Sequence, residues 1–269
     1  MDPASQNPRL DKSRPEPTQT ENKRMSQKQP SGVLETVMTV IYAVIIALVI
    51  RTVAYEPFNI PSGSMKPTLL VGDYLFVSKF SYGYSRHSLP FSLPLIPERI
   101  LYDEPERGDV AVFKLPSNPK IDYIKRVIGL PGDRIQMIQG ILHINGRPIS
   151  REAAGIYVLH DENTGISKPV NRYVETLPNG KKHYIIEAEG DVGYKDNTGV
   201  YVVPRDHFFM MGDNRDNSTD SRFPSVHFVP KENFVGRAEF LFFSIDGSAW
   251  KIWQWFSTVR TDRLFTGIE

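Results

Sequence analysis

The sequence predicts a mainly β fold, in which an antiparallel β core with a β-rich inserted lobe follows one N-terminal transmembrane helix. Three observations predict it. One long apolar run lies near the N-terminus, short strand-like runs closed by Gly-Asp or Asn-Gly turns fill the remainder, and a more polar stretch at about 140–200 is rich in hairpin signals. With 269 residues, 40% of them hydrophobic, the chain can bury one good-sized core.

Residues 1–31 are rich in Pro, Ser, Gln and charge and contain almost no apolar side chains. Such a segment cannot bury enough apolar surface to offset the entropy lost on ordering. We therefore expect a disordered cytoplasmic tail over residues 1–31.

Residues 32–55 are mostly apolar, and their charged residues, Glu35 and Arg51, lie near the two ends. At about 1.5 Å per residue, such a helix spans the roughly 30 Å hydrocarbon core of a bilayer with some tilt. Several Lys and Arg residues precede the run and only Arg51 lies at its far end. The positive-inside bias therefore places the N-terminus in the cytoplasm and residues 56–269 outside it.

Two other interpretations of this run are weaker. A cleavable signal peptide has a short basic start, whereas the polar leader here is about thirty residues long, and Thr52-Val53-Ala54 is only a fair cleavage site. A buried soluble helix would be apolar along one stripe rather than on every side. The pattern favours a single membrane anchor.

After residue 56, short runs rich in β-branched and aromatic residues predict strands. The predicted strands are 74–80, 110–115, 123–129, 135–138, 141–144, 184–188, 201–203, 208–211 and 238–244. Two Asn-Gly pairs, Asn145-Gly146 and Asn179-Gly180, lie between strand-like runs and predict tight hairpins, because this pair supplies the positive φ angles that such turns need.

The segment 249–256 contains all three tryptophans of the chain. Aromatic side chains are enriched at membrane interfaces, but packing in a core explains them equally well. Both interpretations stay open at this point.

Composition excludes several kinds of function. The net charge of +1 gives no argument for nucleic acid binding. The absence of cysteine excludes thiolate catalysis, cysteine-based zinc sites and disulfides. The six histidines are scattered without a close ligand-like pair, so the pattern disfavours a metal site.

The stretch at 60–69 displays Ser64 shortly after the predicted membrane helix. Ser64 lacks the Gly-x-Ser-x-Gly spacing of a nucleophile elbow and the Ser-x-x-Lys spacing of β-lactamases. If Ser64 is a nucleophile, a different base must serve it. Because Ser64 is about ten residues beyond the helix end, it can lie no more than roughly 35 Å from the membrane surface.

Lys125 is a candidate for that base. A strand over 123–129 would place Lys125 on one face with Ile121, Tyr123 and Val127. A serine needs a neutral amine as base, and burial among apolar neighbours can lower the pKa of a lysine by the few units required. The alternative is that Lys125 packs its stem and extends its amine to water, and periodicity does not choose between the two.

A dense polar run at 212–222 follows the apolar residues 208–211. The ordinary interpretation is a solvated loop. A calcium loop of the EF-hand type fails, because counting from Asp216 puts Ser221 where glycine is required and His227 where the closing glutamate belongs.

Taken together and in order, these segments resemble the motifs of bacterial type I signal peptidases. The matching blocks are 61–65 with 67–69, Gly72-Asp73, 123–126 with 129–133, and 212–222. Single blocks are only suggestive, whereas all of them in sequence are highly specific. The resemblance runs from about residue 33 to the C-terminus, and 85–107 and 140–200 follow only its general layout.

The resemblance implies roles for particular residues. Ser64 matches the nucleophile and Lys125 its general base, which form a Ser/Lys dyad. Ser62 matches the hydroxyl that joins the Ser64 amide in the oxyanion hole. Ser218 matches the hydroxyl that orients the lysine amine. The ion-pair cluster that fixes the loop of Ser218 is matched by Asp220, Arg126 and Arg222.

The resemblance also implies a substrate and a location. The family cuts signal peptides from exported preproteins after a small-x-small motif, and it uses neither a metal nor an organic cofactor. Its members lie in the bacterial cytoplasmic (inner) membrane, so we expect a single-pass protein with a periplasmic catalytic domain that contacts the lipid bilayer. Many Gram-negative members have two N-terminal transmembrane helices and a cysteine pair, which this sequence lacks.

Two alternatives belong to other classes. The related self-cleaving Ser/Lys repressors carry a helix-turn-helix and a cuttable Ala-Gly hinge, and the N-terminus here has neither. A non-enzymatic, membrane-anchored scaffold on the same β fold would not need the dyad. Because Ser64 and Lys125 are both present, the sequence favours a membrane-bound serine endopeptidase that removes signal peptides through an acyl-enzyme.

Overall fold

The computed structural model describes residues 32–89, 92–161, 164–247 and 250–268. The expected tail at 1–31 therefore lies outside the described residues. The chain divides into two units, residues 1–43 and 44–269, and each is described by itself.

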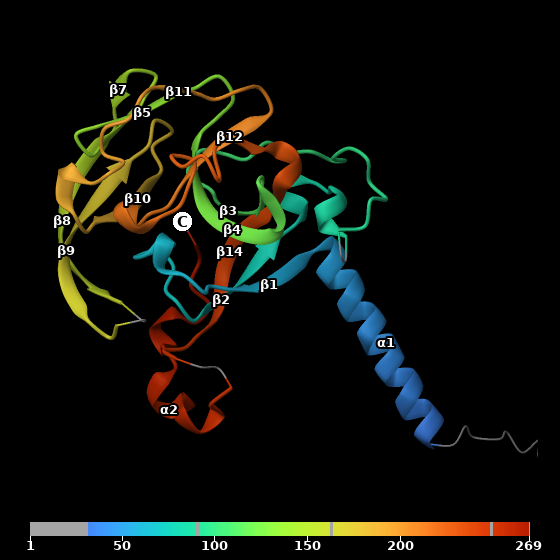
Figure 1. Ribbon diagram of the computed structural model, residues 1–269. Coiled ribbons are helices and arrows are strands. Elements are labelled where there is room, and N and C mark those ends of the chain that lie inside the picture. Colours follow the sequence, from blue (N-terminus) through green and yellow to red (C-terminus); the bar gives the residue numbers. More distant parts are fainter. Residues whose placement is uncertain (1–31, 90–91, 162–163, 248–249, 269) are drawn as a thin grey trace, which may run out of the picture. The chain divides into compact units, whose positions relative to one another are not determined.

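The helix α1 (Gly32–Val53) has the length and the composition to cross a membrane, with a mean hydropathy of 2.5 and no buried residue. Figure 1 shows it as one continuous helix. The sequence predicts this helix over 32–55. It ends at Val53 because Tyr55 already pairs with Ser78 in the first strand.

The largest sheet has seven strands in the order β1-β2-β14-β3-β4-β12-β13, and neighbouring strands are antiparallel. Their bounds are β1 (Tyr55–Asn59), β2 (Asp73–Ser78), β3 (Val110–Leu115), β4 (Asn118–Gly129), β12 (His207–Met211), β13 (Val229–Pro230) and β14 (Phe234–Ser244). Strands β4 and β12 are neighbours in the sheet although about 80 residues separate them, so a long excursion leaves the sheet between them.

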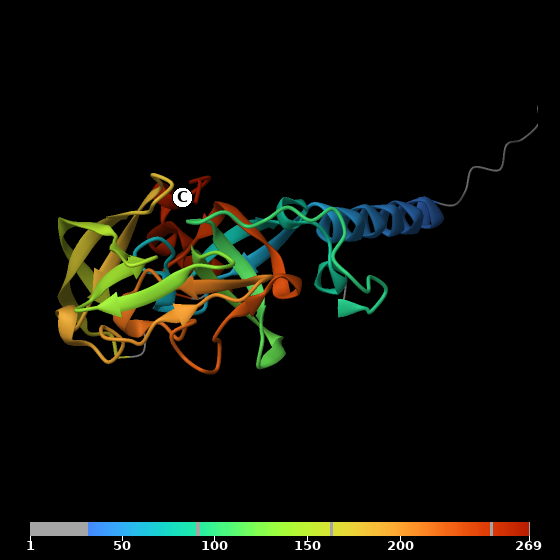
Figure 2. The ribbon, with the colours of Figure 1, turned by 90° about the horizontal axis from the view of Figure 1, so that it is seen from above.

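That excursion forms two smaller antiparallel sheets, ordered β10-β9-β8 and β11-β5-β6-β7. In Figures 1 and 2 the green and yellow strands of these sheets gather on one side of the large sheet. Their bounds are β5 (Arg134–Ile138), β6 (Ile141–Ile144), β7 (Arg147–Pro148), β8 (Ser150–His160), β9 (Ser167–Thr176), β10 (Lys182–Glu187) and β11 (Tyr201–Val202). The fold is thus mainly antiparallel β with one long N-terminal apolar helix, as the sequence predicts.

Helical structure outside α1 is limited to short segments in the described residues. The α-helix α2 spans Trp255–Thr258. The 3₁₀ helices are η1 (Gly63–Met65), η2 (Phe80–Tyr82), η3 (Arg86–Ser88), η5 (Gly190–Val192), η6 (Arg215–Asn217), η7 (Lys231–Asn233), η8 (Ile252–Gln254) and η9 (Thr261–Arg263).

The two predicted hairpins form, but their turns differ. Asn145 and Gly146 both have positive φ angles, 55° and 76°, and Ile144 pairs directly with Arg147 in a two-residue turn. In the second hairpin only Gly180 has a positive φ, and the turn between β9 and β10 is longer. The hairpin itself forms as predicted, since the Leu177 amide donates to Lys181 O across the turn of residues 178–180, but Asn179 lacks the expected positive φ.

Strand β8 is a long element that the sequence analysis missed. Its outer residues are mostly exposed, so no buried face shows as an apolar period. Gly155, with a φ of 87°, lies where the register with β9 shifts, and this bulge interrupts the alternation further.

The C-terminal tryptophans do not enter the core. Trp250 and Trp253 are 90% and 71% exposed, and Trp255 packs its ring on Phe243 at a centroid distance of 5.1 Å. Core packing is therefore the wrong explanation for Trp250 and Trp253. A role at a membrane interface stays a prediction.

Candidate active site

Ser64 lies in the turn η1 between β1 and β2 and is buried. The turn is fixed from below, since Met65 and Leu69 are fully buried in the core cluster that also contains Ile60. It is fixed from the side by Asn214, whose backbone amide donates to Ser64 O (3.1 Å) and whose side chain donates to Gly63 O (3.0 Å). The turn that carries the Ser64 hydroxyl is thus held by core packing on one side and by the loop at 212–222 on the other.

Lys125 projects from β4, where it pairs with Ala111 of β3. Its Nζ lies 2.7 Å from Ser64 Oγ and 2.8 Å from Ile124 O. The side chain is only 4% exposed, so the alternative in which the amine extends to water is wrong. Of the two interpretations of Lys125 that the sequence left open, the structure supports the buried amine.

Burial lowers the pKa of the Lys125 amine to about 8, because a charged ammonium loses its hydration there. The nearby carboxylates of Asp220 and Asp213 act in the opposite direction, but they do not overcome the desolvation. About a tenth of Lys125 is therefore uncharged at pH 7 and about half at pH 8, and an uncharged amine can accept the proton of a hydroxyl.

The run at 212–222 is not the solvated loop of the ordinary interpretation. Most of its side chains are buried, and Asp220, Ser221 and Arg222 are at most 2% exposed. Arg222 forms a two-point ion pair with Asp220, with both N···O distances 2.9 Å. Asp220 also accepts from the Gly212 amide (3.0 Å), so the carboxylate joins the two ends of the loop.

Arg126 anchors the same loop through a different carboxylate. The resemblance implies a cluster of Arg126 with Asp220, whereas the structure pairs Arg126 with Asp213 at 2.9 and 2.8 Å. Thr68 donates to Asp213 as well (2.6 Å). Although burial raises the pKa of Asp213, the Arg126 guanidinium lowers it, and the net pKa lies below its ordinary value.

Ser62 and Ser218 both lie near Ser64 and Lys125. The hydrogen bonding of Ser218 differs from what the resemblance implies. Ser62 is exposed, and its Oγ lies 3.4 Å from Ser64 Oγ. Ser218 is buried, and its Oγ has no hydrogen-bond partner among the residues that the structure describes. The orientation of Lys125 in this structure comes from Ile124 O instead.

All four residues Ser62, Ser64, Lys125 and Ser218 line one groove with a volume of about 1080 Å³. One wall comes from β4 at 121–125, and the opposite wall includes residues of the β8–β9 hairpin such as Leu159, Ile166 and Lys168. An open groove with an apolar and polar lining suits an extended peptide, whose carbonyl could approach the Ser64 hydroxyl.

The sequence analysis missed three residues that build the site: Asp213, Asn214 and Glu175. Asp213 and Asn214 were available from the same polar run, in which Gly212-Asp213 was interpreted as a turn. Glu175 on β9 forms a buried two-point ion pair with Arg215 and thereby holds the loop from the inserted sheet. Nothing local in the sequence marks Glu175, because its partner lies 40 residues away.

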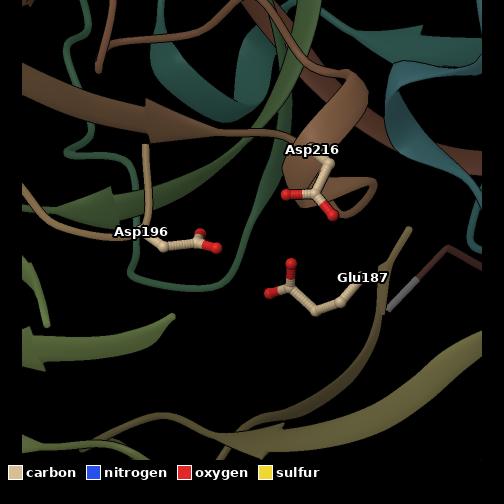
Figure 3. A group of neighbouring side chains, drawn as sticks. All are labelled: Glu187, Asp196 and Asp216. Carbon is tan, nitrogen blue, oxygen red and sulfur yellow. The ribbon is translucent and has the colours of Figure 1, made fainter. Parts of the chain in front are cut away.

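Three carboxylates, Asp216 of this loop with Glu187 and Asp196 beside it, are arranged so that they could hold a metal ion (Figure 3). The group does not include Ser64 or Lys125.

Comparisons with known proteins identify the family. The family profile described as "Signal peptidase, peptidase S26" matches residues 33–243. The chain is 42% identical to signal peptidase I of Rickettsia typhi over 245 residues, which cover 84% of this chain and 90% of the relative. It is 42% identical to signal peptidase I of Rickettsia massiliae over 246 residues, with 85% and 90% covered.

A crystal structure of a signal peptidase I from Enterococcus faecalis is also similar, with 24% identity and a TM-score of 0.29 over 50% of this chain and 97% of that one. This likeness is too distant to carry an argument. The family match and the Rickettsia relatives show that the chain belongs to the S26 family of signal peptidases. It is a serine endopeptidase that cleaves signal peptides.

Gly212 offers a test of how tightly the site is packed. A methyl group at this position would lie 2.2 Å from Ser218 Oγ and 2.5 Å from Ser64 O, so Gly212→Ala must displace one of them. Because small displacements of reacting groups cost roughly 100-fold in rate, we expect a loss of that order in kcat/KM on a signal-peptide substrate. Gly199→Ala is the matched control, since no atom lies within 4 Å of its added methyl. Full activity in Gly212→Ala would contradict this packing.

Proposed function

We propose that Ser64 is the nucleophile of this signal peptidase and that Lys125 is its general base. The observation that carries the proposal is the 2.7 Å separation of Lys125 Nζ and Ser64 Oγ in a buried environment. Distance and burial act together, because the distance permits proton transfer and the burial keeps the amine neutral enough to accept the proton.

In the first half of the proposed reaction, Ser64 Oγ attacks the scissile carbonyl carbon and the hydroxyl proton passes to Lys125 Nζ. The tetrahedral intermediate then collapses, the C–N bond breaks, and the leaving amine of the mature protein takes the proton from Lys125. In the second half, a water molecule attacks the Ser64 ester while Lys125 accepts its proton. The proton returns to Ser64 Oγ as the signal peptide leaves with a new carboxylate.

The negative charge on the carbonyl oxygen needs donors during both halves. We assign the Ser64 backbone amide and the Ser62 hydroxyl to this oxyanion hole, because the exposed Ser62 lies beside Ser64 Oγ at the groove. Asp220 with Arg222, and Arg126 with Asp213, support the loop at 212–222 against this turn. For Ser218 the support is its place beside the dyad in the groove, where Gly212 leaves space for it, while Ile124 O is the group that orients Lys125 in this structure.

The proposed setting is the outer surface of the bacterial cytoplasmic membrane, with α1 as a single anchor in the lipid bilayer and the N-terminus in the cytoplasm. The length and hydropathy of α1 and the charge asymmetry around it support this setting. A preprotein held in the bilayer by its own signal peptide would share a thin layer with the enzyme, which raises their effective concentration. We expect cleavage after a small-x-small motif.

Replacing either member of the dyad should nearly abolish cleavage. We expect Ser64→Ala and Lys125→Met each to lower kcat by at least about 1,000-fold. The nucleophile and its base act as a unit, so removing either one removes the catalytic contribution of both. Lys125→Met keeps the buried volume and removes the amine. The matched controls are Ser257→Ala and Lys120→Met, whose side chains are exposed, the latter on the same strand β4. Rates should be measured on a preprotein in detergent, with circular dichroism to verify folding. Wild-type rates in either dyad variant would overturn the proposal.

The rate should depend on pH through Lys125. The folded pKa of about 8 means that the neutral amine is the major form above pH 8 and declines tenfold per unit below it. We therefore expect kcat/KM to fall roughly 50-fold between pH 8 and pH 6. A peptide substrate without groups that titrate in this range isolates the enzyme's own ionisation. A flat profile from pH 6 to 9 would rule out Lys125 as the base.

The oxyanion assignment predicts a loss in turnover rather than in binding. Ser62→Ala should lower kcat by about 100- to 1,000-fold and leave KM nearly unchanged, because the donor acts on charge that develops only in the transition state. Ser117→Ala removes an equally exposed hydroxyl elsewhere and serves as the control. An effect confined to KM, or no effect, would remove Ser62 from the oxyanion hole.

A further inference from the structure

Three carboxylates converge beside the loop that carries Ser218. Glu187 lies at the end of β10, Asp196 follows η5, and Asp216 lies in η6. One oxygen of each lies within 4.8 Å of the others. Figure 3 shows the three side chains directed toward one common point from three separate segments.

Backbone hydrogen bonds and one oxygen of Asp216 hold two of these segments together. Ile186 forms a parallel bridge with Asn214, and its amide donates to Asp213 O (3.0 Å). Asp216 Oδ2 accepts from the amides of Ala188 (2.6 Å) and Glu189 (2.7 Å). The end of β10 is therefore fixed against the start of η6.

Each aspartate is anchored through one oxygen, which leaves its other oxygen for the cluster. Asp196 Oδ2 accepts from the Gly193 amide (2.6 Å), and Asp196 Oδ1 is buried without a hydrogen-bond partner among the described residues. Asp216 Oδ2 accepts from the amides of Ala188 and Glu189, just after β10, and its Oδ1 faces Gly193. The amides thus fix the positions of both aspartates.

Glu187 is a second and independent indication of a ligand. It is only 1% exposed, it points into the cluster, and neither of its carboxylate oxygens has a hydrogen-bond partner in the described part of the chain. Buried carboxylates are normally paired or bound to a metal. The cation nearest to it in an ion pair, Arg151, lies 3.9 Å away and pairs more closely with Asp191, at 2.8 Å.

Other charges around the cluster are largely matched. Arg215 reduces the pKa of Glu187, but its guanidinium is paired with Glu175. Arg222, which acts on Asp196, is paired with Asp220. Burial raises the pKa of Glu187 to about 9, which agrees with the lack of a close counter-charge for this carboxyl.

We propose that Glu187, Asp196 and Asp216 bind one divalent cation, with calcium preferred over magnesium. Carboxylate oxygens are hard ligands that suit both ions. The three oxygens all lie within 4.8 Å of one another and come from three separate segments. Calcium accepts such an irregular ligand set, whereas magnesium demands near-ideal octahedral geometry.

The cluster has an entry path. Asp216 is partly exposed and lines the active-site groove together with Ala188, Glu189 and Asn217. Water molecules from the groove can complete the coordination, which calcium needs because three protein ligands are fewer than its usual six to eight. The bound ion would tie β10 of the inserted sheet to the loop two residues before Ser218.

The experiment titrates CaCl₂ into the full-length protein in detergent, after dialysis against a chelator, and records heat by isothermal titration calorimetry. We expect one calcium per chain and a rise in Tm of several degrees at saturation. MgCl₂ should bind at least about tenfold more weakly. Neither readout involves cleavage, so the result is separate from the roles of Ser64 and Lys125.

Glu187→Gln is the central variant, because a neutral amide of the same shape removes the negative charge that would bind the cation. Circular dichroism in chelator should verify its folding, and the rise in Tm with calcium should disappear. Asp196→Asn should also lose the rise. Glu152→Gln, exposed on β8, is the matched control and should respond like the wild type.

Two results would overturn the proposal. One is the absence of heat and of any Tm rise in the wild type at about 10 mM CaCl₂, well above the weakest calcium affinities of extracellular modules, roughly 1 mM. The other is unchanged calcium binding in both Glu187→Gln and Asp196→Asn. The wild-type titration decides the question even if a variant does not fold.

Discussion

The catalytic centre depends on one constraint: an amine must stay uncharged while it lies 2.7 Å from a serine hydroxyl. Burial lowers the pKa of Lys125. The carboxylates of Asp220 and Asp213 raise it, because they favour the ammonium form. Each of these carboxylates is paired with an arginine, Asp213 with Arg126 and Asp220 with Arg222. The ion pairs therefore do more than fix a loop, since they also screen Lys125 from negative charge that would restore its ordinary pKa.

The register of the large sheet brings the parts of this centre together. Met211 of β12 pairs with Arg126 of β4, so Gly212 leaves the strand next to Lys125. A glycine is needed there because a side chain would meet Ser218 and the backbone of Ser64. The loop then returns to the turn of Ser64 through Asn214. A pairing between strands about 80 residues apart thus determines the position of the nucleophile relative to its base.

The sequence predicts well those features that depend on neighbours along the chain. Strands β3 and β6 match their predicted bounds, and the Asn145-Gly146 turn forms as expected, because apolar period and turn chemistry are local. The juxtaposition of Ser64 with Lys125 followed from a family resemblance rather than from periodicity. Partners that meet across the fold were not predictable: Arg126 pairs with Asp213, and Glu175 reaches Arg215 from another sheet. Strand β8 was not predicted because most of its residues are exposed and the bulge at Gly155 interrupts its alternation.

The polar loop at 212–222 is ordered because it is attached on two sides. Toward the large sheet, Arg126 and the Gly212 amide bind carboxylates of the loop. Toward the inserted sheet, Glu175 binds Arg215, and the amides of Ala188 and Glu189, just after β10, bind Asp216. These contacts hold Asp216 through one oxygen without any contact to Glu187. A cation bound by the three carboxylates would make the link between the inserted sheet and the loop at 212–222 more rigid. The link itself forms without the cation. The inserted lobe can act on Ser64 through this attachment, because Ile186 of β10 bridges to Asn214, whose amide donates to Ser64 O, and also directly, because Lys66 Nζ donates to His160 O of β8 (2.6 Å).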